Sequence, residues 1–138
     1  MTEEEKITKA LEFILFDQEL REAGYDGIGA FLGEMACLAK FGGEKAPKGT
    51  KAYDIVTPDG RRNQVKTKMG KVYTNENRHY APIDPEHIAK NLVDDVTIVL
   101  VKDKSFEVYR APISKLKGKS HSGGKVRFYL DEIKANAF

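Results

Sequence analysis

Residues 53–68 hold the strongest constraint on the fold, a turn that makes two short strands pair with each other. The turn is Thr57-Pro58-Asp59-Gly60. Proline presets φ at the second position, and glycine takes the left-handed position that closes a three-residue hairpin loop. This loop length fixes the strand register, and the predicted pairs are Thr57–Arg61, Val56–Arg62, Ile55–Asn63 and Asp54–Gln64.

The predicted register brings three polar side chains onto one face of the hairpin. Directly opposed residues on one face have Cβ atoms about 4.5–5.5 Å apart, which applies to Asp54 and Gln64. Side chains alternate between faces along a strand, so Lys66 shares the face of Gln64 and lies diagonal to Asp54. An anionic oxygen, an amide oxygen and an ammonium group are therefore expected to converge on one patch.

The elements around the hairpin predict an α/β fold in which helices flank a central mixed β-sheet. The 138 residues suffice for one compact domain, and no apolar stretch approaches the roughly 20 residues that span a bilayer. Residues 96–101 are nearly all apolar and β-branched, which is typical of a strand buried on both faces. The single domain 1–138 is expected to contain helices 3–23, 27–41 and 84–92, the hairpin 52–69, and strands 96–101, 106–110 and 126–130.

Two helices precede the hairpin. In 3–23, one apolar stripe runs from Ile7 to Gln18 and a second runs from Phe13 to Leu20, so we expect this helix to be covered on more than one side. In 27–41 the apolar stripe consists of Ile28, Phe31, Leu32, Met35 and Ala39. Glu34 falls at the margin of that stripe, from which its carboxylate can lean towards a neighbouring sheet or stay in solvent.

Charge is distributed unevenly along the chain. Residues 1–34 contain nine acids and three bases, whereas residues 35–138 contain twelve acids and twenty bases. This asymmetry suggests a polyanionic partner for the C-terminal part, although an ordinary lysine-rich surface explains it equally well. Cys37 is the only cysteine, which excludes an internal disulfide and favours a cytoplasmic location.

The polar residues of the hairpin suit the chemistry of magnesium. Mg²⁺ takes oxygen ligands and is usually held by one or two carboxylates together with water. Asp54 offers a carboxylate, Gln64 an amide oxygen, Val65 its backbone carbonyl and Glu34 a second carboxylate. Lys66 is placed to stabilise the charge that develops in phosphodiester hydrolysis or to orient the attacking water.

This pattern resembles that of the PD-(D/E)XK nuclease superfamily, also called restriction endonuclease-like. The resemblance rests on a helix with Glu34, a strand with Asp54 and a strand with Gln64-Val65-Lys66, and it extends over residues 27–101. It implies that Asp54 and Gln64 bind the metal, that Lys66 is the catalytic lysine and that Glu34 is an accessory acid.

Two positions depart from the family pattern. Tyr53 stands where proline is expected, and Gln64 replaces the usual acid, which removes one negative charge from the site. Pro58-Asp59 matches the family name more literally, but Asp59 belongs to the turn and is rejected as a ligand.

Basic and aromatic residues beyond the hairpin are candidate phosphate contacts. Lys68, Lys71, Arg78 and Tyr80 follow the lysine-bearing strand, and Lys119, Lys125 and Arg127 lie in or beside a glycine-rich loop. The expected function is that of a metal-dependent nuclease, with Mg²⁺ or alternatively Mn²⁺, acting as an endonuclease on DNA. A non-catalytic nucleic-acid-binding module and an interaction subunit that retain the fold are the alternatives, and a homodimer would allow both strands to be cut.

Overall fold

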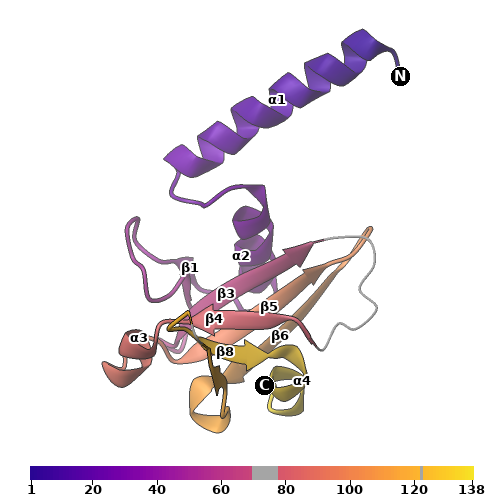
Figure 1. Cartoon of the computed structure of the whole chain (residues 1–138). Coiled ribbons are helices and arrows are strands. Elements are labelled where there is room, and N and C mark those ends of the chain that lie inside the picture. The colour runs from indigo at the N-terminus through magenta and orange to yellow at the C-terminus, as the bar shows by residue number, and fades with distance from the viewer. Residues whose placement is uncertain (70–77, 122) are drawn as a thin grey trace.

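A computed structural model of the chain describes residues 1–69, 78–121 and 123–138 (Figure 1). The helices are α1 (Glu3–Glu22), α2 (Ile28–Phe41), α3 (Pro85–Ala89) and α4 (Leu130–Ala135), with a 3₁₀ turn at Ile113–Lys115. The strands are β1 (Glu44–Lys45), β2 (Ile55–Val56), β3 (Arg62–Met69), β4 (Tyr80–Ile83), β5 (Asp95–Val101), β6 (Phe106–Pro112), β7 (Lys119–Ser120) and β8 (Val126–Tyr129). Among the described residues, no helix combines the length and apolarity needed to cross a membrane.

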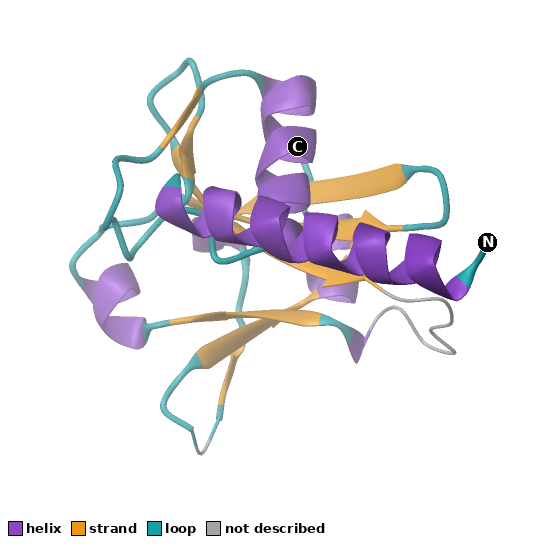
Figure 2. Cartoon of the chain, turned by 90° about the horizontal axis from the view of Figure 1, so that it is seen from above, coloured by secondary structure: helices purple, strands orange, loops and turns teal. Residues whose placement is uncertain are grey.

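The prediction of a mixed sheet flanked by helices is confirmed. Five strands form one sheet in the order β1-β2-β3-β5-β6, in which β3 and β5 run parallel and the other pairs antiparallel. A second, antiparallel sheet has the order β4-β8-β7. In the view from above (Figure 2), the two sheets form separate layers.

The five-stranded sheet is covered on both faces, which places β5 in the interior as predicted. On one face Val96, Ile98 and Leu100 pack with residues of β4, β8 and α4. On the other face Val99 packs with Cys37 of α2. The result is one α/β domain with a core on each side of the sheet.

The hairpin forms with the predicted turn and most of the predicted register. Gly60 has φ 84°, the left-handed conformation that the turn requires, and the Thr57 N–H donates to the Arg61 carbonyl at 2.9 Å. Strand pairing then ends at Ile55 and Asn63. The predicted Asp54–Gln64 pair is not formed, because the Asp54 N–H donates to the Asn63 carbonyl instead, at 2.9 Å.

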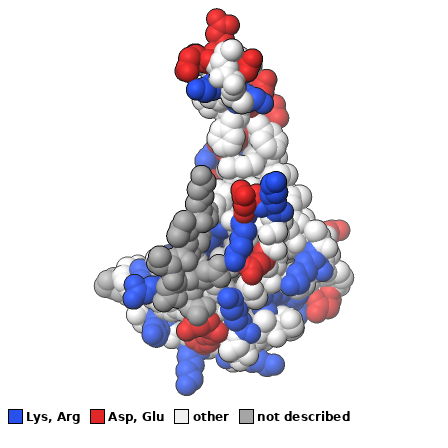
Figure 3. Space-filling view, turned by 90° about the vertical axis from the view of Figure 1, so that its right-hand side faces the viewer, with Lys and Arg blue, Asp and Glu red and all other residues white. Residues whose placement is uncertain are grey.

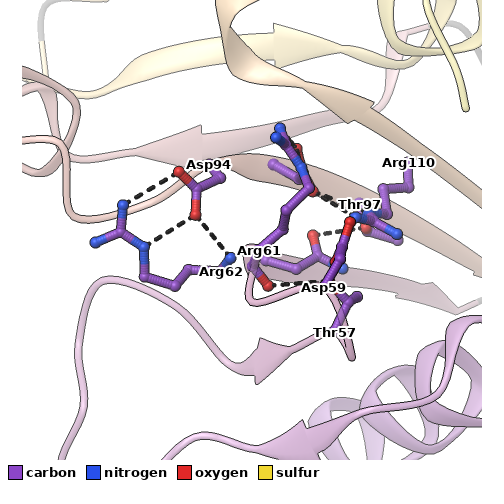
Figure 4. Close-up of polar contacts among 9 residues, drawn as sticks. Thr57, Asp59, Arg61, Arg62, Asp94, Thr97 and Arg110 are labelled. Carbon is purple, nitrogen blue, oxygen red and sulfur yellow. Dashed lines mark hydrogen bonds and ion pairs between the residues drawn. The ribbon is translucent and has the colours of Figure 1, made fainter.

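An ion-pair network joins the start of β3 to the start of β5 (Figure 4). Arg62 binds Asp94, with a shortest distance of 2.9 Å. Arg61 and Arg110 both bind the fully buried Asp95. Because these contacts tie neighbouring parallel strands together, they fix the register in which Asn63 lies opposite Asp95.

Three segments differ from the sequence prediction because their partners are distant in the chain. Residues 80–83, outside every predicted helix and strand, form β4, and Pro82 is tolerated there because β4 is an edge strand. Residues 119–120 form β7 within the expected glycine-rich loop. The last strand ends at Tyr129, so Leu130 begins α4 and does not end a strand.

The N-terminal helices also differ from expectation. α2 turns Gly33, Glu34 and Cys37 towards the sheet, and the predicted stripe is only partly buried, with Ala39 exposed. Gly33 permits this contact, since a Cβ there would lie 1.9 Å from the Thr67 hydroxyl oxygen. The predicted cover of α1 is wrong: every residue from Glu3 to Phe16 is exposed, because α2 already covers this face of the sheet.

Candidate active site at the open edge of β3

The candidate site lies where β3 extends beyond the end of its shorter neighbour β2. β2 has two residues and β3 has eight, so β2 pairs with β3 only at Arg62 and Asn63. From Gln64 onwards, no described strand pairs with β3 on this side. The edge is therefore open to side chains and ligands, and residues from both faces of β3 border the same space.

Asp54 takes the place that a strand partner would occupy at this edge. Its Oδ2 accepts a hydrogen bond of 2.8 Å from the Val65 N–H. The N–H and C=O of a strand residue point to the same side, so the Val65 carbonyl also faces the open edge. The chain thus presents a carboxylate and a backbone carbonyl side by side.

A pocket of about 610 Å³ lies against this edge. Glu34 reaches it from α2, Lys45 from β1, and Asp54 from the segment before β2. Gln64, Val65 and Lys66 of β3 complete the predicted set, and all of these residues line the pocket. The structure therefore brings together every residue that the sequence singled out for metal binding and catalysis.

Glu34 is the most strongly perturbed acid of the pocket. It is 4% exposed, and its Oε1 lies 3.2 Å from Lys45 Nζ. Burial, with a smaller contribution from the charge of Asp54, raises the pKa of Glu34 to about 7. The sequence alternative of a solvated Glu34 is therefore wrong.

The Asp54 carboxyl is perturbed in the same direction. Burial raises its pKa, against the Val65 N–H and the charges of Lys45 and Lys66, which lower it. Two neighbouring carboxyls thus resist ionisation together, and a bound cation would relieve both.

Four charged residues of this pocket escaped the sequence analysis, namely Asp26, Lys45, Lys48 and Lys51. Lys45 pairs with Glu34 and lies 4.3 Å from the ring centroid of Tyr25, and Asp26 lines the pocket and adds negative potential at Glu34 and Asp54. Lys45 belongs to the two-residue strand β1 and the others sit in connections between elements, where no periodic pattern indicates what a side chain faces. The basic composition of residues 43–52 was the only available signal.

The donors of the pocket fit a magnesium ion. Asp54, Glu34, the Gln64 amide and the Val65 carbonyl supply oxygen atoms, which Mg²⁺ prefers, and two carboxylates are its usual complement. The described residues contain no group of three or more His, Cys, Asp or Glu side chains arranged for a metal. The set is thus poor for zinc and suited to an ion that keeps several water ligands.

A cluster of cations and tyrosines continues from the pocket onto the second sheet. Lys68 lies 5.1 Å and Arg127 4.1 Å from the ring centroid of Tyr80. Tyr80 packs against Tyr129 at 5.6 Å between centroids, and Lys119 lies 5.4 Å from the Tyr129 ring. Burial and the nearby charge of Lys66, two residues earlier on β3, lower the pKa of Lys68.

The other predicted nucleic-acid contacts lie outside this cluster. Lys125 is 3.8 Å from Asp84, which partly offsets its charge. Arg78 is exposed, two residues before β4 begins. Lys71 lies outside the described residues.

No family model and no curated protein matches the chain. One solved structure with some similarity is that of Archaeoglobus fulgidus Hjc, a Holliday junction resolvase from an archaeal hyperthermophile. The alignment has 11% identity and a TM-score of 0.43, and covers 78% of this chain and 93% of Hjc. A similarity of this size is too weak to establish a common fold or activity.

Proposed function

We propose that this chain is a Mg²⁺-dependent nuclease that hydrolyses phosphodiester bonds, with DNA as its preferred substrate and internal bonds as its target. The single observation that carries the proposal is the pair of carboxyls with raised pKa, Glu34 and Asp54, beside Lys66 at an open strand edge. Such perturbed groups in a cleft are typical of functional sites. A purely structural role would not require two carboxyls whose ionisation burial disfavours.

Each residue of the pocket has a chemical task in this proposal. Asp54 and Glu34 would hold the ion, together with the Gln64 amide and the Val65 carbonyl. When bound, Mg²⁺ polarises the phosphoryl group and acidifies a water molecule. Lys66 would donate to a phosphoryl oxygen and stabilise the charge that develops there.

Lys45 would balance charge when no ion is bound. Its ammonium group neutralises part of the Glu34 charge across 3.2 Å. Because Lys45 also lines the pocket, it would be placed to meet a phosphate of the substrate. Lys48 and Lys51, which also line the pocket, would guide the backbone of a nucleic acid towards it.

The cluster of cations and tyrosines suggests the path that a bound nucleic acid would follow beyond the pocket. Lys68, Arg127 and Lys119 would contact phosphates, and Tyr80 and Tyr129 offer rings for bases or sugars. Sequence-independent contacts of this kind favour weak sequence specificity.

A second candidate function, a non-catalytic nucleic-acid-binding module, is favoured by one observation. Glu34 already has a cation, Lys45, as its partner, so the pocket is partly neutralised without metal. In that case the basic surface would bind nucleic acid with strong salt dependence and without turnover.

Cleavage of plasmid, branched and single-stranded DNA with Mg²⁺ or Mn²⁺ separates the two candidates. Wild type is compared with Lys66→Ala and with the matched control Lys90→Ala, whose side chain pairs with Glu86 on exposed α3, away from the pocket. The proposal expects cleavage by wild type and Lys90→Ala and at least about a hundredfold loss in Lys66→Ala. Equal cleavage by all three would reject the assignment of Lys66, and binding without cleavage would select the second candidate.

A further inference from the structure

The N-terminal helix α1 projects from the domain and is attached only near its C-terminal end (Figure 1). Leu20 is its only buried residue. Phe16 packs edge-on against Phe31 of α2, with 6.1 Å between ring centroids. Part of the second predicted apolar stripe therefore packs within the chain, at the end of α1 nearest the body.

The first apolar stripe has no cover within the described part of the chain. Ile7, Leu11 and Ile14 are each at least 50% exposed. Figure 3 shows uncharged residues along the projecting helix, between a tip with charges of both signs and the body. Helices in proteins owe most of their stability to packing of an apolar face, so a free stripe of this length on a projecting helix requires a partner.

The helix is nevertheless built to stay helical up to its tip. Thr2 and Glu5 form a capping box, and Glu3, Glu4 and Glu5 place negative charge on the first turn. Asp17 and Arg21 form an ion pair of 2.9 Å along the helix. The stripe is therefore presented on a stabilised helix.

The spacing of the stripe is that of a coiled coil. Glu4, Ile7, Leu11, Ile14, Gln18 and Arg21 follow one another at alternating intervals of three and four residues. This is the repeat that brings side chains onto one seam between two paired helices.

We infer that α1 pairs in antiparallel orientation with α1 of a second copy of this chain. If Leu11 of one copy faces Ile14 of the other, the two-fold axis makes Ile14 face Leu11 in turn. The same register sets Ile7 against Gln18 and Glu4 against Arg21 at both ends. The seam is thus apolar in its middle and closed by opposite charges, and it becomes self-complementary only when the second helix is reversed.

Charge argues for this partner over a lipid surface. Residues 3–22 carry seven acids and three bases, a net negative charge that an anionic membrane would repel. None of the residues that line the pocket belongs to α1. The pairing does not depend on the proposed nuclease activity, although it would place two pockets in one particle.

Sedimentation equilibrium of the full chain over a range of concentrations tests the pairing. Wild type is expected to show twice the mass of one 15.5 kDa chain. Leu11→Glu, at an exposed position, is expected to raise the dissociation constant at least about thirtyfold while the circular dichroism spectrum keeps its helical signal. The matched control Phe106→Glu, at an exposed apolar residue of β6, is expected to leave the dimer unchanged.

A charge exchange tests the register. Glu4→Arg and Arg21→Glu are each expected to weaken the dimer about tenfold, since each change is repeated at both ends, and the double variant is expected to recover wild-type association. A wild-type monomer at all concentrations would overturn the inference, as would a dimer that Leu11→Glu leaves intact. Failure of the double variant to recover would overturn the antiparallel register, and binding of monomeric wild type to anionic vesicles would assign the stripe to a membrane instead.

Discussion

Two pairs of acids lie beside the same sheet and behave in opposite ways. At the start of β3 and β5, Asp94 and Asp95 are satisfied by arginine side chains, and Arg62 holds the pKa of Asp94 below its usual range. At the open edge of β3, burial raises the pKa of Glu34 to about 7 and also raises the pKa of Asp54.

The difference lies in the balance between burial and neighbouring charge: the hydrogen bond from Arg62 dominates at Asp94, and burial dominates at Glu34. The carboxylate of Asp95 is held by two guanidinium groups, whereas Glu34 shares a single lysine with a neighbouring negative charge. Opposite charges nearby favour an ionised carboxyl, and burial with like charges disfavours it. The first cluster therefore stabilises the fold. The second lowers the stability of the fold and leaves its carboxyls available to a ligand.

The largest effect is expected from breaking the satisfied cluster. Asp95→Asn leaves Arg61 and Arg110 without their shared carboxylate, and removal of one partner from a buried ion pair costs about 3–5 kcal/mol. Urea unfolding measures the loss, with Asp94→Asn as control, since Asp94 is more exposed and should cost about 1 kcal/mol. A loss below 1 kcal/mol in Asp95→Asn would show that the network does not carry the stability assigned to it.

At the open edge of β3 we expect a substitution to change stability with the opposite sign as pH rises. Glu34 has a pKa of about 7 in the folded state against an ordinary value of 4.5, so the folded state binds the extra proton between these values. Its contribution to the unfolding free energy therefore falls as pH rises through this window, by roughly 3 kcal/mol in total. Glu34→Gln removes the titrating carboxyl. The stability of this variant relative to wild type should therefore rise between pH 5 and pH 8.

Unfolding titrations of both proteins at several pH values measure this difference. Glu44→Gln, at an exposed acid of neighbouring β1, is the matched control and should follow the wild-type curve. A constant difference between Glu34→Gln and wild type across the range would contradict the raised pKa.

Binding of Mg²⁺ is expected to change the unfolding free energy by a smaller amount. If Mg²⁺ binds Glu34 and Asp54, it competes with protons, so its stabilising effect should be larger at pH 8 than at pH 6. At a concentration ten times the dissociation constant the gain is about 1.4 kcal/mol, visible as a rise in Tm. The rise should be absent in Asp54→Asn, and an equal rise in both proteins would place the ion elsewhere.

The sequence predicted what local chemistry determines. The Pro58–Gly60 turn set the hairpin and its first pairs, and the alternation along β3 placed Lys66 and Gln64 on one face. The same reasoning missed the end of pairing at Asn63, because a register inferred from the turn assumes that the ladder continues. That break is what opens the edge of β3.

Features that depend on distant packing could not be read from the pattern. Lys45 reaches Glu34 only because β1 pairs with β2, and β4 forms only because β8 supplies its partner. The two stripes of α1 were recognised, but periodicity shows that a face is apolar and not whether the same chain covers it.

The most direct test of the site is the rate of plasmid cleavage at pH 8 as Mg²⁺ is titrated, with wild type beside Asp54→Asn. We expect the wild-type rate to rise and saturate with Mg²⁺, and the variant to be at least about a hundredfold slower at every concentration. Equal rates and equal Mg²⁺ dependence in the two proteins would contradict the assignment of metal-dependent cleavage to the open edge of β3.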